Sequence, residues 1–228
     1  MFFLLIGLAA VSGLVPQRRH ARHTRLHAAA SASTEAGRLL AEQLKGTNLY
    51  LVGMMGCGKS SVGDELTRML GSYAFVDTDS TLETAMNSTV AEFFAAEGED
   101  AFRKAEGMIL NQVAAYVRLV VGTGGGIVTQ TANWAALRSG IVVWINPAVD
   151  VLEARLLGAE MESRPLLKDA SDISRILEER TGFYDQADVS VSVESLDELP
   201  RETAAKVVQD VLDFIRKNPP KKEPNPIL

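Results

Sequence analysis

The stretch Gly53-Met54-Met55-Gly56-Cys57-Gly58-Lys59-Ser60 decides the fold. It fits the pattern G-x-x-x-x-G-K-[ST], follows a short apolar run at 48–52 and opens a segment at 59–70 whose apolar residues have helical spacing. In such a loop, glycines let successive backbone N–H groups turn around a β-phosphate, and the helix N-terminus adds its dipole. We expect Lys59 to reach the β- and γ-phosphates and the Ser60 hydroxyl to ligate Mg²⁺.

On both sides of this loop, strand and helix patterns alternate without an internal repeat. The uninterrupted apolar run at 141–145 indicates a strand buried on both faces. Alternation of this kind predicts an α/β fold: a three-layer P-loop NTPase architecture with a central parallel sheet flanked by helices, like the nucleoside monophosphate kinases, with a mobile lid. Further strands are expected at 74–76, 119–121 and 189–193, helices at 80–116, 149–157, 173–180 and 197–217, and a polar loop at 158–172.

Composition narrows the chemistry. The chain has 228 residues, and its net charge of -6 argues against a nucleic-acid binder. The histidines are confined to positions 20, 23 and 27, and Cys57 is the single cysteine. An internal disulfide, a thiolate-rich metal site and a histidine-dependent triad are therefore excluded from the predicted domain. A general base must be a carboxylate, lysine, tyrosine or water.

The first 45 residues have the composition of a targeting segment. An apolar run at 1–16 precedes a segment rich in Arg, Ala and Ser, and the first acidic residue is Glu35. We interpret the two as a signal peptide followed by a transit peptide, the bipartite arrangement of algae whose plastids lie behind extra membranes. A single chloroplast or mitochondrial presequence is the alternative. We thus expect a presequence and linker at 1–45, a folded domain at 46–217, a disordered tail at 218–228, and a mature plastid protein that binds no membrane.

Further motifs follow the phosphate loop in order. They are Phe-Val-Asp-Thr-Asp at 75–79, Gly-Glu-Asp-Ala-Phe-Arg-Lys-Ala-Glu at 98–106, Thr-Gly-Gly-Gly at 123–126, Ser-Arg-Pro-Leu-Leu at 163–167, and Glu-Arg at 179–180 followed by Phe-Tyr at 183–184. Together they resemble the shikimate kinase family. The resemblance implies that ATP phosphorylates the 3-hydroxyl of shikimate, giving shikimate 3-phosphate and ADP for chorismate and aromatic amino acid synthesis. We expect a monomer that uses Mg²⁺ and has no nucleic-acid partner.

The residue types suit that chemistry. Arg103 and Arg180 can hold a substrate carboxylate through forked hydrogen bonds. Asp79, where a strand meets the nucleotide crevice, can accept bonds from substrate hydroxyls and orient or deprotonate the attacking one. Asp77 is two residues earlier, so on an extended chain it points to the same side, where it can hold Mg²⁺ through water. Arg164, on the predicted lid, can swing onto the γ-phosphate.

The remaining assignments come from the resemblance, which places Gly125 against the substrate and Arg155 against adenine. The expected catalytic residues are Asp79, Lys59 and Arg164. The expected ATP-binding residues are Gly56, Cys57, Gly58, Lys59, Ser60, Ser61, Arg155 and Arg164. The expected substrate-binding residues are Asp79, Arg103, Gly124, Gly125, Gly126 and Arg180, and the expected metal ligands are Ser60 and Asp77.

Other interpretations stay open at this point. Arg103 and Glu106 could be a surface ion pair on a helix, the aspartates at 77 and 79 could cap a turn, and Arg155 could be solvated. The sequon at 87–89 is interpreted as a turn at a helix boundary. For the whole chain, the alternatives are another small-molecule P-loop kinase, acting on gluconate or a nucleotide, and a plastid regulatory protein without kinase activity.

Overall fold

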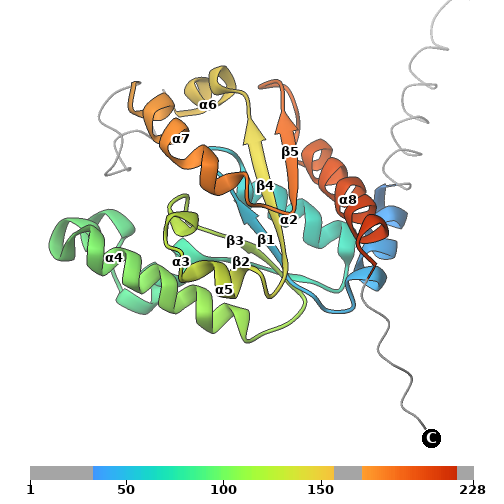
Figure 1. Cartoon of the computed structure of the whole chain (residues 1–228), viewed down its shortest axis with the longest axis horizontal. Coiled ribbons are helices and arrows are strands. Elements are labelled where there is room, and N and C mark those ends of the chain that lie inside the picture. The colour runs from blue at the N-terminus through green and yellow to red at the C-terminus, as the bar shows by residue number, and fades with distance from the viewer. Residues whose placement is uncertain (1–32, 157–170, 220–228) are drawn as a thin grey trace, which may run out of the picture.

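A computed structural model describes residues 33–156 and 171–219. Its centre is a sheet of five parallel strands in the order β2-β3-β1-β4-β5 (Figure 1). This confirms the predicted parallel α/β fold. The strands are β1 (Leu49–Val52), β2 (Ala74–Asp77), β3 (Leu119–Gly122), β4 (Ile141–Pro147) and β5 (Val189–Val193).

Helices cover both faces of the sheet (Figure 1). They are a helix at 33–44, α2 (Lys59–Leu70), α3 (Thr78–Met86), α4 (Val90–Ala114), the 3₁₀ turn η1 (Ile127–Thr129), α5 (Asn133–Leu137), α6 (Val149–Leu156), α7 (Ser171–Tyr184) and α8 (Pro200–Lys217). The bounds of α2 and β5 are those expected from the sequence. Residues 171–172, expected in a loop, instead begin α7, where Asp172 pairs with Arg175 one turn later. Residues 157–170, with most of the predicted lid, lie outside the described residues.

Two hydrophobic clusters occupy the two faces of the sheet. Leu49 and Leu51 pack in one cluster with α2 and α8, whereas Tyr50 and Val52 pack in the other with α4 and α5. This alternation follows from the two-residue period of a strand. Along β4, Val142 and Trp144 likewise join one cluster while Val143 and Ile145 join the other. The predicted burial of this run on both faces is confirmed.

The helical pattern expected at 80–116 is divided into two helices. Asn87 ends α3 in the left-handed conformation (φ 51°), and Thr89 begins α4 with a capping box completed by Glu92. The turn predicted at 87–89 is confirmed. Within α4, Gly98 has φ 80° and ψ 176°, which breaks the helical path. Arg103 and Glu106 lie in the segment of α4 after this kink.

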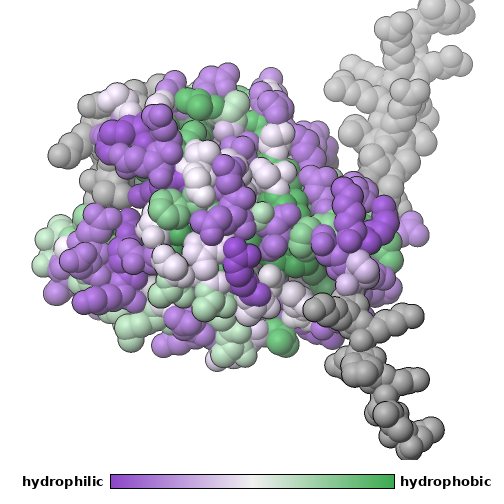
Figure 2. Space-filling view, in the orientation of Figure 1, coloured by the Kyte–Doolittle hydropathy of each residue, from purple (hydrophilic) through white to green (hydrophobic). Residues whose placement is uncertain are grey.

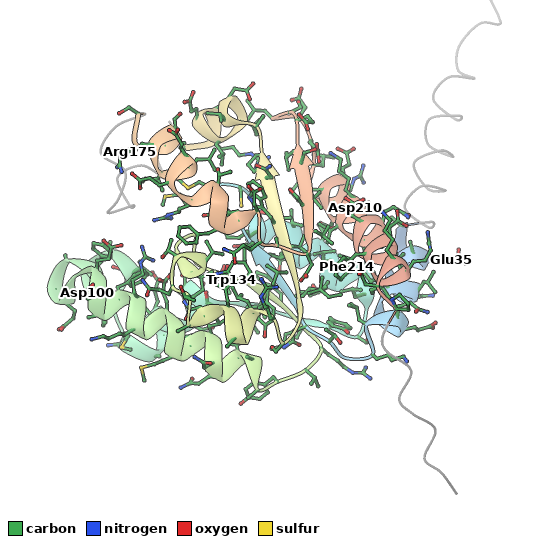
Figure 3. All side chains as sticks on the ribbon, in the orientation of Figure 1. Glu35, Asp100, Trp134, Arg175, Asp210 and Phe214 are labelled. Atoms are coloured by element: carbon green, nitrogen blue, oxygen red, sulfur yellow. The ribbon has the colours of Figure 1, made fainter. Side chains whose placement is uncertain are left out.

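The helix at 33–44 belongs to the packed unit. Leu40 and Leu44 are buried with α2 and α8, and Gly37 lies so close to Met69 that a β-carbon there would contact the Met69 backbone. Figure 3 labels Glu35 on this helix and Phe214 on the neighbouring α8. The packed unit therefore includes this helix from Ala36 onward, a correction to the boundary at 46 predicted from the sequence.

Hydrophilic side chains dominate the face shown in Figure 2, with hydrophobic residues between them. Among the helices of residues 33–156 and 171–219, none is long and apolar enough to cross a membrane.

Candidate active site

A pocket of about 1000 Å³ opens at the carboxyl ends of the strands, the edge at which open α/β sheets bind ligands. The phosphate loop forms one part of its wall, and α3, α4 and the turn at 123–126 form another. The predicted site residues that line it are Gly56, Cys57, Gly58, Lys59, Ser60, Ser61, Asp77, Asp79, Arg103, Gly124, Gly125, Gly126, Arg155 and Arg180. Arg164 lies outside the described residues.

The phosphate loop turns tightly between β1 and α2. Gly53, Gly56 and Gly58 have φ values of 140°, 76° and 97°, a region that favours glycine. The Lys59 ammonium donates hydrogen bonds to the backbone oxygens of Gly53 (2.9 Å) and Met54 (3.0 Å). These bonds hold the Lys59 ammonium at the phosphate loop, where we expect it to contact the phosphates of a nucleotide.

Two further side chains lie at this loop, one from the loop itself and one from α6. The Cys57 side chain is buried in the hydrophobic cluster beside α2, with its sulfur 3.5 Å from the Lys59 nitrogen. Arg155 of α6 donates from Nη1 to the Cys57 backbone oxygen at 3.1 Å. Arg155 is thus attached to the phosphate loop and is not simply solvated. Its contact with adenine stays a prediction.

Asp77 joins the phosphate loop to α3. Its Oδ2 accepts a hydrogen bond from the Ser60 hydroxyl at 2.9 Å, while its Oδ1 accepts from the backbone N–H groups of Asp79 (2.9 Å) and Ser80 (3.2 Å). Asp77 therefore does cap α3, and its second oxygen faces Ser60. Because Asp79 lies in the first turn of α3, the two aspartates are not on one extended strand, contrary to the expectation from the sequence.

This pair of oxygens fits Mg²⁺. Magnesium commonly takes one or two protein oxygens, with water and substrate phosphates as its other ligands. Within 33–156 and 171–219, no group of three or more His, Cys, Asp or Glu side chains could hold a metal by itself. Ser60 and Asp77 therefore suit a metal that arrives with a nucleotide.

Arg103 and Glu106 form an ion pair one turn apart on α4, with Nη1 and Oε2 2.6 Å apart. The side chains are only 9% and 3% exposed, so the interpretation as a surface pair is wrong. Glu99 holds the Arg103 Nη2 at 3.0 Å. Burial raises the pKa of Glu106 to about 7, against the opposing effect of Arg103, and the nearby Asp79 carboxylate raises it further. Glu106 was not among the predicted site residues.

The turn at 123–126 needs glycine because charged side chains pack on its backbone. A β-carbon at Gly124 would overlap the Glu106 carboxylate and lie 2.8 Å from the Asp79 Oδ1. A β-carbon at Gly126 would overlap the Arg103 guanidinium. The turn therefore gathers Asp79, Glu106 and Arg103 around one stretch of bare backbone.

Arg180 reaches the same turn from α7. Its side chain is buried, and its Nη1 would lie 3.6 Å from a β-carbon at Gly125. Two buried guanidinium groups, from α4 and α7, thus approach the glycine turn from different helices. Each guanidinium carries forked N–H donors of the kind that bind a carboxylate.

Sequence reasoning missed other parts of the wall. Phe94 and Phe102 stand as an apolar pair with ring centroids 5.7 Å apart, and the segment at 196–200 between β5 and α8 closes another part of the pocket. Phe102 falls inside the quoted motif at 98–106, which offered a signal. The segment at 196–200 offered none, because its place depends on how α8 packs.

Comparison with known proteins agrees with this geometry. The sequence model of the family described as shikimate kinase matches residues 55–215. A shikimate kinase of Trichormus variabilis is 43% identical over 176 residues, covering 76% of this chain and 95% of that protein. A shikimate kinase of Synechococcus sp. strain RCC307 is 45% identical over 164 residues, covering 71% and 83%.

A solved structure is also similar. The shikimate kinase of Acinetobacter baumannii in complex with shikimate superposes with a TM-score of 0.66 at 32% identity, covering 78% of this chain and 97% of that one. The family match and the identities across most of both chains agree with the arrangement of phosphate loop, aspartates and arginines. The chain belongs to the shikimate kinase family.

Proposed function

We propose that this protein transfers the γ-phosphoryl group of ATP to the 3-hydroxyl of shikimate, giving shikimate 3-phosphate and ADP. One observation carries the proposal. A single pocket has a phosphate loop in one part of its wall and, in another, two buried arginines beside a carboxylate and a glycine turn. The first part suits a nucleotide, and the second suits a small carboxylated polyol.

At the acceptor end, Arg103 and Arg180 bind the carboxylate of the substrate. Glu106 and Glu99 fix the Arg103 guanidinium from two sides, which leaves its position preorganised. Asp79 accepts a hydrogen bond from the attacking hydroxyl and orients it, and it is the candidate for removing the proton. The bare backbone at 124–126 lets the substrate ring approach closely.

At the donor end, Lys59 and the loop N–H groups bind the β- and γ-phosphates. Ser60 and Asp77 hold Mg²⁺, which when bound neutralises phosphate charge. Arg155 keeps the loop backbone and α6 together and lies beside the nucleotide. Arg164 is assigned to the transferring phosphoryl group, where its charge offsets the charge of the transition state.

We further propose that the enzyme is a monomer and works in a plastid, with a mitochondrion as the alternative. The Arg-rich, acid-free composition upstream of Glu35 supports an organelle presequence. The cyanobacterial source of the similar shikimate kinases supports a plastid. Fusion of residues 1–45 to a fluorescent protein in algal cells tests the destination, and cytosolic fluorescence would contradict it.

The activity is tested with a coupled assay of ADP formation by the full chain in the presence of ATP and Mg²⁺. Shikimate, gluconate and AMP are compared as acceptors. Of the three acceptors, we expect only shikimate to be phosphorylated, and we expect this turnover to be lost when Mg²⁺ is chelated. Lys59→Ala should abolish turnover and retain calorimetric shikimate binding, since Lys59 is assigned to phosphate. ADP release with gluconate or AMP alone would favour another small-molecule kinase. Shikimate binding without turnover in the wild type would favour a regulatory protein.

A further inference from the structure

Tyr184 is the last residue of α7 and is completely buried. Its hydroxyl donates a hydrogen bond of 2.6 Å to the backbone oxygen of Gly125. Its ring stacks on Trp144 of β4, with centroids 5.6 Å apart and planes at 22°. The ring and the hydroxyl are therefore both fixed, and the hydroxyl is held against the middle glycine of the turn that faces the pocket.

Tyr184 also adjoins an arginine of the site. Arg180 precedes it by four residues, so the two side chains lie on the same face of α7. Burial raises the pKa of the Tyr184 hydroxyl, and the neighbouring Arg180 opposes this with a smaller effect. The phenol therefore keeps its proton at neutral pH and can serve as a donor to Gly125.

The Gly125 carbonyl needs such a restraint. Its neighbours in the turn are Gly124 and Gly126, and a run of glycines has more backbone freedom than any other. Because the peptide group is planar and trans, fixing the direction of the carbonyl also fixes the direction of the following N–H. Gly125 in addition faces the phosphate loop, where a β-carbon on it would lie 3.2 Å from the Met55 nitrogen.

We propose that Tyr184 is a positioning residue for the acceptor site: its hydroxyl locks the Gly125 peptide and the end of α7 together, so that the glycine turn and Arg180 meet the substrate in one fixed geometry. The inference rests on the proposed function, because the acceptor is taken to be shikimate. Tyr184 is not among the residues that line the pocket, so it acts through Gly125 and Arg180 and does not touch the substrate.

The test is Tyr184→Phe, which keeps the ring on Trp144 and removes only the hydroxyl. The matched control is Tyr50→Phe: Tyr50 is equally buried in the same cluster, its hydroxyl bonds to Ser139 at 3.2 Å, and it does not line the pocket. For Tyr184→Phe in the full chain we expect the KM for shikimate to rise about tenfold, with the KM for ATP changed less than about twofold. For Tyr50→Phe we expect both KM values to stay as in the wild type.

The melting temperature of each variant separates positioning from stability. If both variants lose similar thermal stability while only Tyr184→Phe loses affinity for shikimate, the positioning role stands. If Tyr184→Phe lowers the melting temperature but leaves the KM for shikimate unchanged, Tyr184 is structural and the inference is overturned. A wild type that does not phosphorylate shikimate would instead overturn the proposed function, and this inference with it.

Discussion

The Arg103 guanidinium and the Glu106 carboxylate form an ion pair of 2.6 Å between side chains that are 9% and 3% exposed. The pair stands between the core and the pocket, and the backbone of Gly126 covers the guanidinium. A buried pair of this kind depends on both partners, because removing one leaves an uncompensated charge in a poorly solvated place. This relationship links the stability of the protein to the geometry of its acceptor site.

Arg103→Ala is expected to raise the KM for shikimate about tenfold or more, with a smaller effect on the KM for ATP. It should also destabilise the fold by about 3 kcal/mol above pH 7, where Glu106 is ionised beside Arg103 and without it becomes an unpaired buried charge or must take up a proton. The double variant Arg103→Ala/Glu106→Gln should recover part of that stability in urea unfolding and none of the affinity. Arg103→Lys should rescue incompletely, because an ammonium lacks the planar fork. If Arg103→Ala raises the KM equally for shikimate and for a shikimate analogue that lacks the carboxylate, Arg103 does not bind this group.

The pH dependence of stability should carry the signature of Glu106. Its pKa in the folded protein is about 7, raised by burial from the ordinary value of 4.5, so between these values the folded state holds a proton that the unfolded state has lost. Stability contributed by this group is present at low pH and is lost as the pH rises toward 7. The loss amounts to about 3 kcal/mol across that window.

Glu106→Gln removes this titration. We expect the wild type to lose stability relative to Glu106→Gln as the pH rises from 5 to 7.5, measured as the free energy of unfolding in urea at each pH. Parallel pH profiles for the two proteins would mean that Arg103 keeps Glu106 ionised throughout.

Gly126→Ala should damage the acceptor site by steric displacement. The φ of Gly126 is -96°, which alanine adopts freely, so the effect comes from the overlap of the added methyl group with the Arg103 guanidinium. We expect the KM for shikimate to rise about tenfold, as for loss of one charged hydrogen bond. The matched control is Gly182→Ala, where a β-carbon has no heavy atom within 4 Å. Steady-state kinetics that change equally in both variants would exclude this explanation.

Deletion of residues 1–45 should destabilise the protein, whereas deletion of residues 1–32 should not. Leu40 and Leu44 become buried against α2 and α8, and each buried leucine contributes about 1.5–3 kcal/mol. The shorter deletion keeps this helix and the longer one removes it. Melting temperatures of the two truncated chains and the full chain decide the matter: equal values for both truncated chains would show that the helix at 33–44 adds nothing to the fold.

Features set by residues close together in the sequence were predicted well, and features set by contacts between distant segments were not. The phosphate loop, α2 and β5 were predicted within the observed bounds because spacing along the chain sets hydrogen bonding and amphipathic faces within each element. The parallel sheet followed from the alternation of these elements. The break in α4 at Gly98 was not predicted, because the sequence does not show which backbone conformation a single glycine in a helical pattern adopts.

The sequence by itself determined the phosphate loop, the aspartates at 77 and 79 and the family to which the motifs belong. Only the tertiary structure decided that the Arg103–Glu106 pair is buried, since a spacing of three residues fits an exposed pair equally well until the turn at 123–126 packs on it. The bond from Tyr184 to Gly125 and the packing of the helix at 33–44 were likewise decided by the fold. These contacts join residues that are distant along the chain, and they form only where the sheet and its helices bring the segments together.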